Sequence, residues 1–175
     1  MSARGDDLWR RAASFAARAH GGHVRKDGRT PYAAHPFRVA MTVRDVFRCA
    51  DAECIAAALL HDVVEDTPHD YDDIAAEFGV AVAGMVSALT KDMRLEESAR
   101  EAEYDARLAR ADWRARLIKL ADVLDNLHDM RSPRDAAAVA RHEQRCSRAM
   151  ALAESDAAEH PETGRALAAL REALG

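Results

Sequence analysis

Hydrophobic residues recur three or four positions apart along nearly the whole chain, the spacing that places them on one side of an α-helix. In the first such segment, residues 7–20, Leu8, Phe15 and Ala19 share a side, and Gly21-Gly22 ends the pattern. The same spacing predicts further helices over residues 32 or 33 to 46, 52–60, 71–78, 80–90, 96–111, 113–129, 134–157 and 161 or 162 to 174. No segment alternates apolar and polar residues as a strand does, so we expect at most a short β-hairpin.

Helix-capping and helix-breaking residues fall between these segments. Asp51, Asp70 and Asp112 each precede a helical stretch, where an aspartate can accept backbone N–H groups of the first turn. Gly79 suits the position just after a helix, and Ser132-Pro133 separates the helix that ends near residue 129 from the next one. Because no repeat, low-complexity tract or linker divides the 175 residues, we expect a single all-α domain over residues 1–175.

Charge and composition narrow the possible functions. The 30 acidic residues outnumber the 25 lysines and arginines and give a net charge of −5, whereas a protein that binds nucleic-acid polymers needs a basic face. The longest candidate for a membrane segment, Val80 to Leu89, is too short to cross a bilayer, and the first residues lack signal-peptide composition. The 3 cysteines lack the paired spacing of a zinc site and predict buried thiols in a reducing compartment. We therefore expect a cytoplasmic protein that binds neither nucleic-acid polymers nor membranes but can still take a small phosphate ligand.

The most informative polar cluster follows the strongly apolar segment 52–60, where His61-Asp62 precedes Glu65 and Asp66. Imidazole nitrogens and carboxylate oxygens are the usual ligands of divalent transition metals, and a metal would offset the cost of burying a carboxylate here. If the helix continues, Glu65 and Asp66 stack on His61 and Asp62 at i, i+4 spacing, where two acids could hold and deprotonate a water. The alternative is a solvated helix end, which is the better interpretation of the His-Asp dipeptide alone. Acids at the negative end of a helix dipole are unfavourable, which supports a functional reason.

Three further stretches carry candidate residues. His35 precedes a proline at a helix start, and Asp122 with Asn126 lies beside the apolar stripe of a later helix. A buried aspartate needs a partner, for which a metal is one candidate. Arg25 and Lys26 stand in a glycine-containing loop shortly before His35, where two cations would suit an anionic phosphate. Taken singly, each of these residues is more often a capping residue or ordinary surface charge than part of a site.

Six stretches occur in the order of one known motif set: Ala19–Lys26, Thr30–Pro36, Ala56–Thr67, Phe78-Gly79, Leu89–Lys91 and Ile118–Asp122. In sequence and order they resemble the HD superfamily, and more closely the hydrolase domain of the RelA/SpoT enzymes and the small alarmone hydrolases. The resemblance covers about residues 15–130 and implies an HD-type helical bundle, in agreement with the hydrophobic spacing. It also implies a phosphohydrolase that removes pyrophosphate from the 3′ position of guanosine 3′,5′-bis(diphosphate), the alarmone of the stringent response.

The resemblance assigns roles to individual residues. It implies one divalent ion, commonly manganese, bound by His35, His61, Asp62 and Asp122. Glu65 and Asp66 would orient and activate the attacking water, and Asn126 would contact the substrate near the metal. Arg25 and Lys26 would hold the base or the phosphates of a small nucleotide.

The chain departs from the family pattern near the expected substrate. His23 stands where glutamine is usual, and the loop before Pro31 is a residue longer than is common. Val123 replaces a common basic residue, and His128 replaces an arginine. Two alternatives therefore stand beside alarmone hydrolysis: an HD hydrolase of another nucleotide or phosphate ester, and a non-catalytic HD module that binds a metal or nucleotide as a regulator. A purely structural helical protein would leave the aligned polar residues unexplained.

Overall fold

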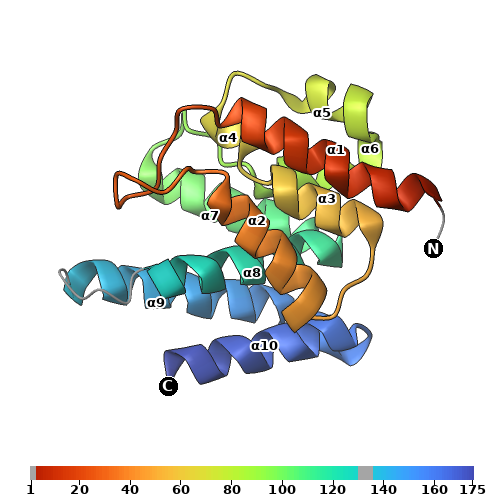
Figure 1. Cartoon of the computed structure of the whole chain (residues 1–175). Coiled ribbons are helices and arrows are strands. Elements are labelled where there is room, and N and C mark those ends of the chain that lie inside the picture. The colour runs from red at the N-terminus through yellow and green to blue at the C-terminus, as the bar shows by residue number, and fades with distance from the viewer. Residues whose placement is uncertain (1–2, 130–135) are drawn as a thin grey trace.

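Helices dominate the structure, as the hydrophobic spacing predicts. The computed structural model describes residues 3–129 and 136–175 (Figure 1). Its helices are, in chain order, α1 (Ala3–Ala19), α2 (Ala34–Met41), the π-helical turn η1 (Thr42–Val46), α3 (Ala52–Leu60), α4 (Val63–Asp66), α5 (Tyr71–Phe78), α6 (Val80–Leu89), α7 (Glu97–Arg110), α8 (Trp113–Asp129), α9 (Ala136–Ala153), the 3₁₀ turn η2 (Glu154–Ala158) and α10 (Pro161–Leu174). Within the described ranges, β pairing is limited to an isolated antiparallel bridge between Val24 and Pro31. The all-α prediction is confirmed.

The predicted caps occupy the expected helix ends. Asp51 and Asp112 each accept a first-turn backbone N–H, at 2.7 and 2.9 Å. Asp70 forms a capping box with the third residue of α5. Gly79 ends that helix with a φ of 91°, a conformation that glycine adopts without strain. The predicted break at Ser132-Pro133 lies outside the described residues.

The chain leaves regular helix at His61-Asp62. α3 ends at Leu60, and a turn leads into the short helix α4. The continuous helix on which i, i+4 stacking of the acids depends is therefore absent, although the Asp66 N–H still donates to the Asp62 carbonyl at 2.9 Å. Adjacent side chains on a regular helix point about 100° apart. Here Asp62 Oδ1 lies 3.2 Å from His61 Nε2, so the turn lets both side chains face one point.

The central helix is α3, the apolar segment of the sequence. Residues 56–60 are buried, and α3 packs against α1, α2, α6 and α8. α8 also packs against α9 and α10, which lie below α2 and α3 in Figure 1. The end of α3, the start of α2 and the middle of α8 therefore meet in the interior. All three cysteines are buried and free, and no helix among the described residues is long and apolar enough to cross a membrane.

Candidate metal centre and substrate cavity

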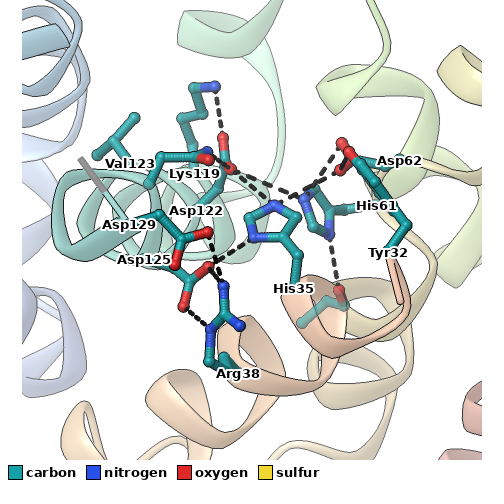
Figure 2. A network of polar contacts seen from close by, with 12 residues as sticks. Tyr32, His35, Arg38, His61, Asp62, Lys119, Asp122, Val123, Asp125 and Asp129 are labelled. Atoms are coloured by element: carbon teal, nitrogen blue, oxygen red, sulfur yellow. Dashed lines mark hydrogen bonds and ion pairs between the residues drawn. The ribbon is translucent and has the colours of Figure 1, made fainter. Parts of the chain in front are cut away.

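Four predicted ligands from three separate segments meet in the interior (Figure 2). His35 opens α2, His61 and Asp62 form the turn after α3, and Asp122 lies in the middle of α8. His35 Nε2 is 3.2 Å from Asp122 Oδ1 and 3.5 Å from Asp62 Oδ2. His61 Nε2 is 3.2 Å from Asp62 Oδ1 and 3.8 Å from Asp122 Oδ1. The structure thus brings two imidazoles and two carboxylates to one point.

The donor atoms at this point fit a divalent metal ion. One ligand atom from each of His35, His61 and Asp62 lies within 4.8 Å of the other two. His61 Nδ1 lies 2.8 Å from the Ala58 carbonyl, so Nδ1 carries a proton and Nε2 faces the carboxylates. That Nε2 is buried without a hydrogen-bond partner, which is the mark of an atom that awaits a ligand. Nitrogen and oxygen donors in this combination suit transition-metal ions.

Electrostatics at the same point also favour a cation. Burial disfavours the imidazolium form of His61, but the adjacent Asp62 carboxylate outweighs burial and raises the pKa of His61 to about 9. Burial likewise disfavours the ionised form of Asp62, but His61 outweighs it and lowers the pKa of that carboxyl. The two carboxylates stabilise a proton on the imidazole because they create a negative potential there, and the same potential attracts a metal ion.

Neighbouring side chains orient the two predicted carboxylate ligands. The sequence predicted a role near the metal for only one of these neighbours, Asn126. The Tyr32 hydroxyl donates to Asp62 Oδ2 at 2.6 Å, and Lys119 Nζ donates to Asp122 Oδ2 at 2.8 Å. Asn126, which was predicted to contact the substrate near the metal, donates its amide to Asp122 Oδ1 at 2.6 Å. Such contacts orient ligands and tune their basicity.

Asp125 is the most important residue that the sequence interpretation missed. Its Oδ2 lies 2.7 Å from His35 Nδ1, and its carboxylate also accepts two bonds from Arg38. The sequence held one indication of this role: Asp125 lies one turn after Asp122 in α8, on the buried side of that helix.

The two predicted catalytic acids lie at the wall of a cavity of about 740 Å³ that the four ligands also line. Glu65 is half-buried, and its Oε2 accepts the Lys91 backbone N–H at 2.8 Å. Burial raises the pKa of Glu65, which moves this carboxylate toward the range of a general base. Asp66 is exposed at the same wall.

The predicted basic loop borders this cavity. Arg25 and Lys26 both line it, and Arg25 Nη2 donates to Asn126 Oδ1 at 2.8 Å and to Asp129 Oδ2 at 2.7 Å. The Arg25 guanidinium also lies 5.4 Å from the centre of the Tyr32 ring. The sequence interpretation missed the other cations of the lining, which come from α2, α8, α9 and the segment after α6: Arg38, Lys91, Lys119, Arg141 and Arg145. The cavity therefore has an acidic, histidine-bearing floor. We call five cations of the lining the basic rim: Arg25, Lys26, Lys91, Arg141 and Arg145. Lys119 and Arg38 instead bond Asp122 and Asp125.

The departures from the family pattern differ in position. Val123 lines the cavity. His128 instead lines a second, shallow groove beside Phe37 and Met41, and His23 lines neither. Of the three substituted positions, only Val123 therefore faces the place where a substrate would lie, together with the longer loop, whose Arg25, Lys26 and Thr30 line the cavity.

The fold and this site define the class of the protein. Residues 12–146 match the HD domain family, and the chain belongs to that family. The resemblance to RelA/SpoT-type hydrolases that the motifs suggested is confirmed.

Particular relatives narrow the resemblance. The chain is 43% identical over 118 residues to the guanosine-3′,5′-bis(diphosphate) 3′-pyrophosphohydrolase MESH1 of Drosophila melanogaster, an alignment that covers 66% of this chain and 65% of the relative. It is 41% identical over 120 residues to the guanosine-3′,5′-bis(diphosphate) 3′-pyrophosphohydrolase of Aquifex aeolicus, covering 67% of this chain and 17% of that one. A solved structure of a metazoan ortholog of SpoT, described as hydrolysing ppGpp and acting in starvation responses, superposes with a TM-score of 0.83 at 29% identity, covering 99% of this chain and 94% of the other. The chain thus spans just under two thirds of the fly relative's length.

Proposed function

We propose that this chain is a metal-dependent phosphohydrolase that removes pyrophosphate from the 3′ position of guanosine 3′,5′-bis(diphosphate). Its ligands would be His35, His61, Asp62 and Asp122, its ion Mn²⁺, and its working unit one domain over residues 1–175. The observation that carries the proposal is the meeting of two imidazoles and two carboxylates on the floor of a cavity with a basic rim. The alarmone hydrolases among the relatives support the choice of substrate.

The residues of the floor suit hydrolysis. A divalent ion bound there would supply Lewis acidity and lower the pKa of water. Glu65 would accept the proton of the attacking water, since its carboxylate is oriented by the Lys91 N–H and its pKa is raised by burial. Asp66, at the same wall, would orient that water.

The residues of the rim suit a nucleotide that bears two diphosphates. Arg25 would stack on the base or bind a phosphate through its planar guanidinium, while Lys26 would act as a point charge. Asn126 would contact the substrate next to Asp122. In the structure Arg25 donates hydrogen bonds to Asn126 and Asp129, so these bonds would be replaced by bonds to the substrate when it binds.

Turnover of a nucleotide panel by protein of known metal content tests the proposal. Metal-free protein is loaded with Mn²⁺, Mg²⁺, Co²⁺ or Zn²⁺ in turn, release of pyrophosphate is measured from guanosine 3′,5′-bis(diphosphate) and GTP, and release of phosphate is measured from 3′-monophosphates. We expect metal-dependent release from the 3′-pyrophosphate alone, with Mn²⁺ most active. Turnover of another phosphate ester without any guanosine pyrophosphate would retire the alarmone substrate. Metal and nucleotide binding without turnover of any compound would instead favour a regulatory module.

A further inference from the structure

A pair of charged residues behind the metal floor joins α2 to α8. Arg38 donates through Nε to Asp125 Oδ1 at 2.6 Å and through Nη2 to Asp125 Oδ2 at 2.8 Å. The same Asp125 Oδ2 lies 2.7 Å from His35 Nδ1. Figure 2 shows the Asp125 carboxylate bonded to both the His35 ring and the Arg38 guanidinium.

The pair determines which nitrogen of His35 faces the floor. An imidazole whose Nδ1–H donates to a carboxylate keeps the lone pair of Nε2 free for a ligand. His35 Nε2 is the atom that lies near Asp62 and Asp122. Asp125 is only 6% exposed, and a carboxylate buried to that extent is costly unless a cation and hydrogen bonds compensate it. Arg38 supplies both through a two-pronged bond.

The pair also reaches the rim. Arg38 Nη2 donates to Asp129 Oδ2 at 2.9 Å, and the same oxygen accepts from Arg25. A row of charge-assisted bonds thus runs from His35 through Asp125, Arg38 and Asp129 to Arg25.

We propose that Arg38 and Asp125 are positioning residues that hold His35 in the orientation required to bind the metal ion. The inference rests on the metal site of the proposed function, and it does not depend on the identity of the substrate. Arg38 touches neither the ion nor the reacting atoms in this arrangement: it acts through Asp125, and Asp125 acts through His35. Loss of either residue should therefore weaken metal binding by about 10–100-fold, the usual effect of removing a partner of a metal-binding histidine.

A double-mutant cycle on metal affinity tests this order of action. The metal-free forms of four proteins are titrated with Mn²⁺: wild type, Arg38→Ala, Asp125→Ala and the double variant. The visible absorption of the Co²⁺-loaded form of each protein is also recorded. If Arg38 acts through Asp125, the double variant binds Mn²⁺ no more than threefold more weakly than Asp125→Ala alone. The Co²⁺ spectra of both single variants should change in the same direction, because each substitution removes the same restraint on the His35 ring.

Two further variants separate positioning from general damage to the fold. Arg44→Ala removes an exposed arginine that bonds only its neighbour Asp45 among the described contacts, and it should leave Mn²⁺ affinity within threefold of wild type. Arg38→Lys keeps the charge and should recover part of the affinity even if Arg38→Ala folds poorly, as judged by thermal unfolding of the metal-free forms.

The result that would overturn the proposal is a folded Arg38→Ala protein with unchanged affinity and Co²⁺ spectrum, a folded Asp125→Ala protein with unchanged affinity, or a double variant whose losses simply add. Because the readout is metal binding, failure to hydrolyse any guanosine pyrophosphate would count against the proposed substrate and leave this test intact.

Discussion

The floor and the rim of the cavity are built in opposite ways. On the floor, His35 and His61 are 1% and 3% exposed, and their ring nitrogens are fixed by groups on packed helices. On the rim, Lys26 and Arg145 are exposed, and Arg25 comes from a loop that lacks regular structure. Positions fixed by helix packing cannot shift without disturbing the core, whereas loop side chains can change with little structural cost. Under the proposed function, the floor would therefore determine the type of chemistry, and the rim would determine which phosphate compound is bound.

The sharpest test of the floor is the removal of one ligand. Asp62→Ala removes a carboxylate next to both imidazoles, so we expect Mn²⁺ affinity to fall by more than about 100-fold, beyond the usual loss for an outer partner. Activity should fall to background. Metal analysis of purified protein and Mn²⁺ titration measure the effect, with Asp45→Ala as the control, since Asp45 is exposed and paired with Arg44. A full equivalent of tightly bound metal in Asp62→Ala would show that the floor is assembled differently.

The next test separates metal binding from proton transfer. Glu65→Gln keeps an oxygen that can accept the Lys91 N–H but loses the ability to take a proton. We expect kcat to fall by roughly 10²–10⁴-fold while metal content stays at the wild-type level. Steady-state kinetics at saturating Mn²⁺ measure this, and Glu97→Gln, on the exposed start of α7, is the control. Wild-type turnover by Glu65→Gln would mean that another group accepts the proton.

The same contrast explains how much the sequence could predict. Helix positions were predicted from hydrophobic spacing, because each helix depends on neighbours in the chain, and the four candidate ligands were predicted from motifs that resemble those of a known family. The Arg38–Asp125 pair joins residues 87 apart, and no local pattern indicates that these two charges meet. Arg141 and Arg145 reach the rim only because α9 packs on α8, where His142 Nε2 lies 2.9 Å from the Val123 carbonyl. Long-range packing of this kind becomes visible only in the folded chain.

A change on the rim should affect substrate affinity and leave the floor intact. Arg25→Ala removes a guanidinium that would make charge-assisted bonds worth about 1.5–3 kcal/mol, so we expect KM to rise by roughly 10-fold or more. We expect kcat to change less than threefold, which is the pattern of lost uniform binding. Arg29→Ala is the matched control, since Arg29 belongs to the same loop but does not line the cavity. A fall in kcat without a rise in KM would place Arg25 in the chemical step instead.

The smallest expected effect comes from Asp27, which shapes the basic loop but does not touch the cavity floor. Asp27 accepts the backbone N–H groups of Arg29 and Thr30 at 2.9 and 2.8 Å, and the Thr30 hydroxyl at 2.5 Å. Thr30 in turn accepts the Arg25 N–H through its carbonyl at 2.8 Å, so Asp27 fixes the backbone that carries Arg25. Asp27→Ala should raise KM by about two- to tenfold, the worth of one ordinary hydrogen bond, with kcat and Mn²⁺ affinity unchanged.

Substitution with asparagine and a pH series complete this test of the loop. Asp27→Asn retains an acceptor for both N–H groups and should restore a KM close to wild type.

The Thr30 hydroxyl, followed by the two backbone N–H groups, lowers the pKa of Asp27 to about 2 from its ordinary value of 3.8. A lowered pKa means that the carboxylate stabilises the loop above pH 3.8 and that this contribution disappears only as pH falls through about 2. Asp27 should therefore add no pH dependence to KM between about pH 6 and 9, and the ratio of the Asp27→Ala KM to the wild-type KM should be flat across that range. A ratio that varies with pH there would show that the loop is controlled by another titrating group, and that the rim is less independent of the floor than the structure indicates.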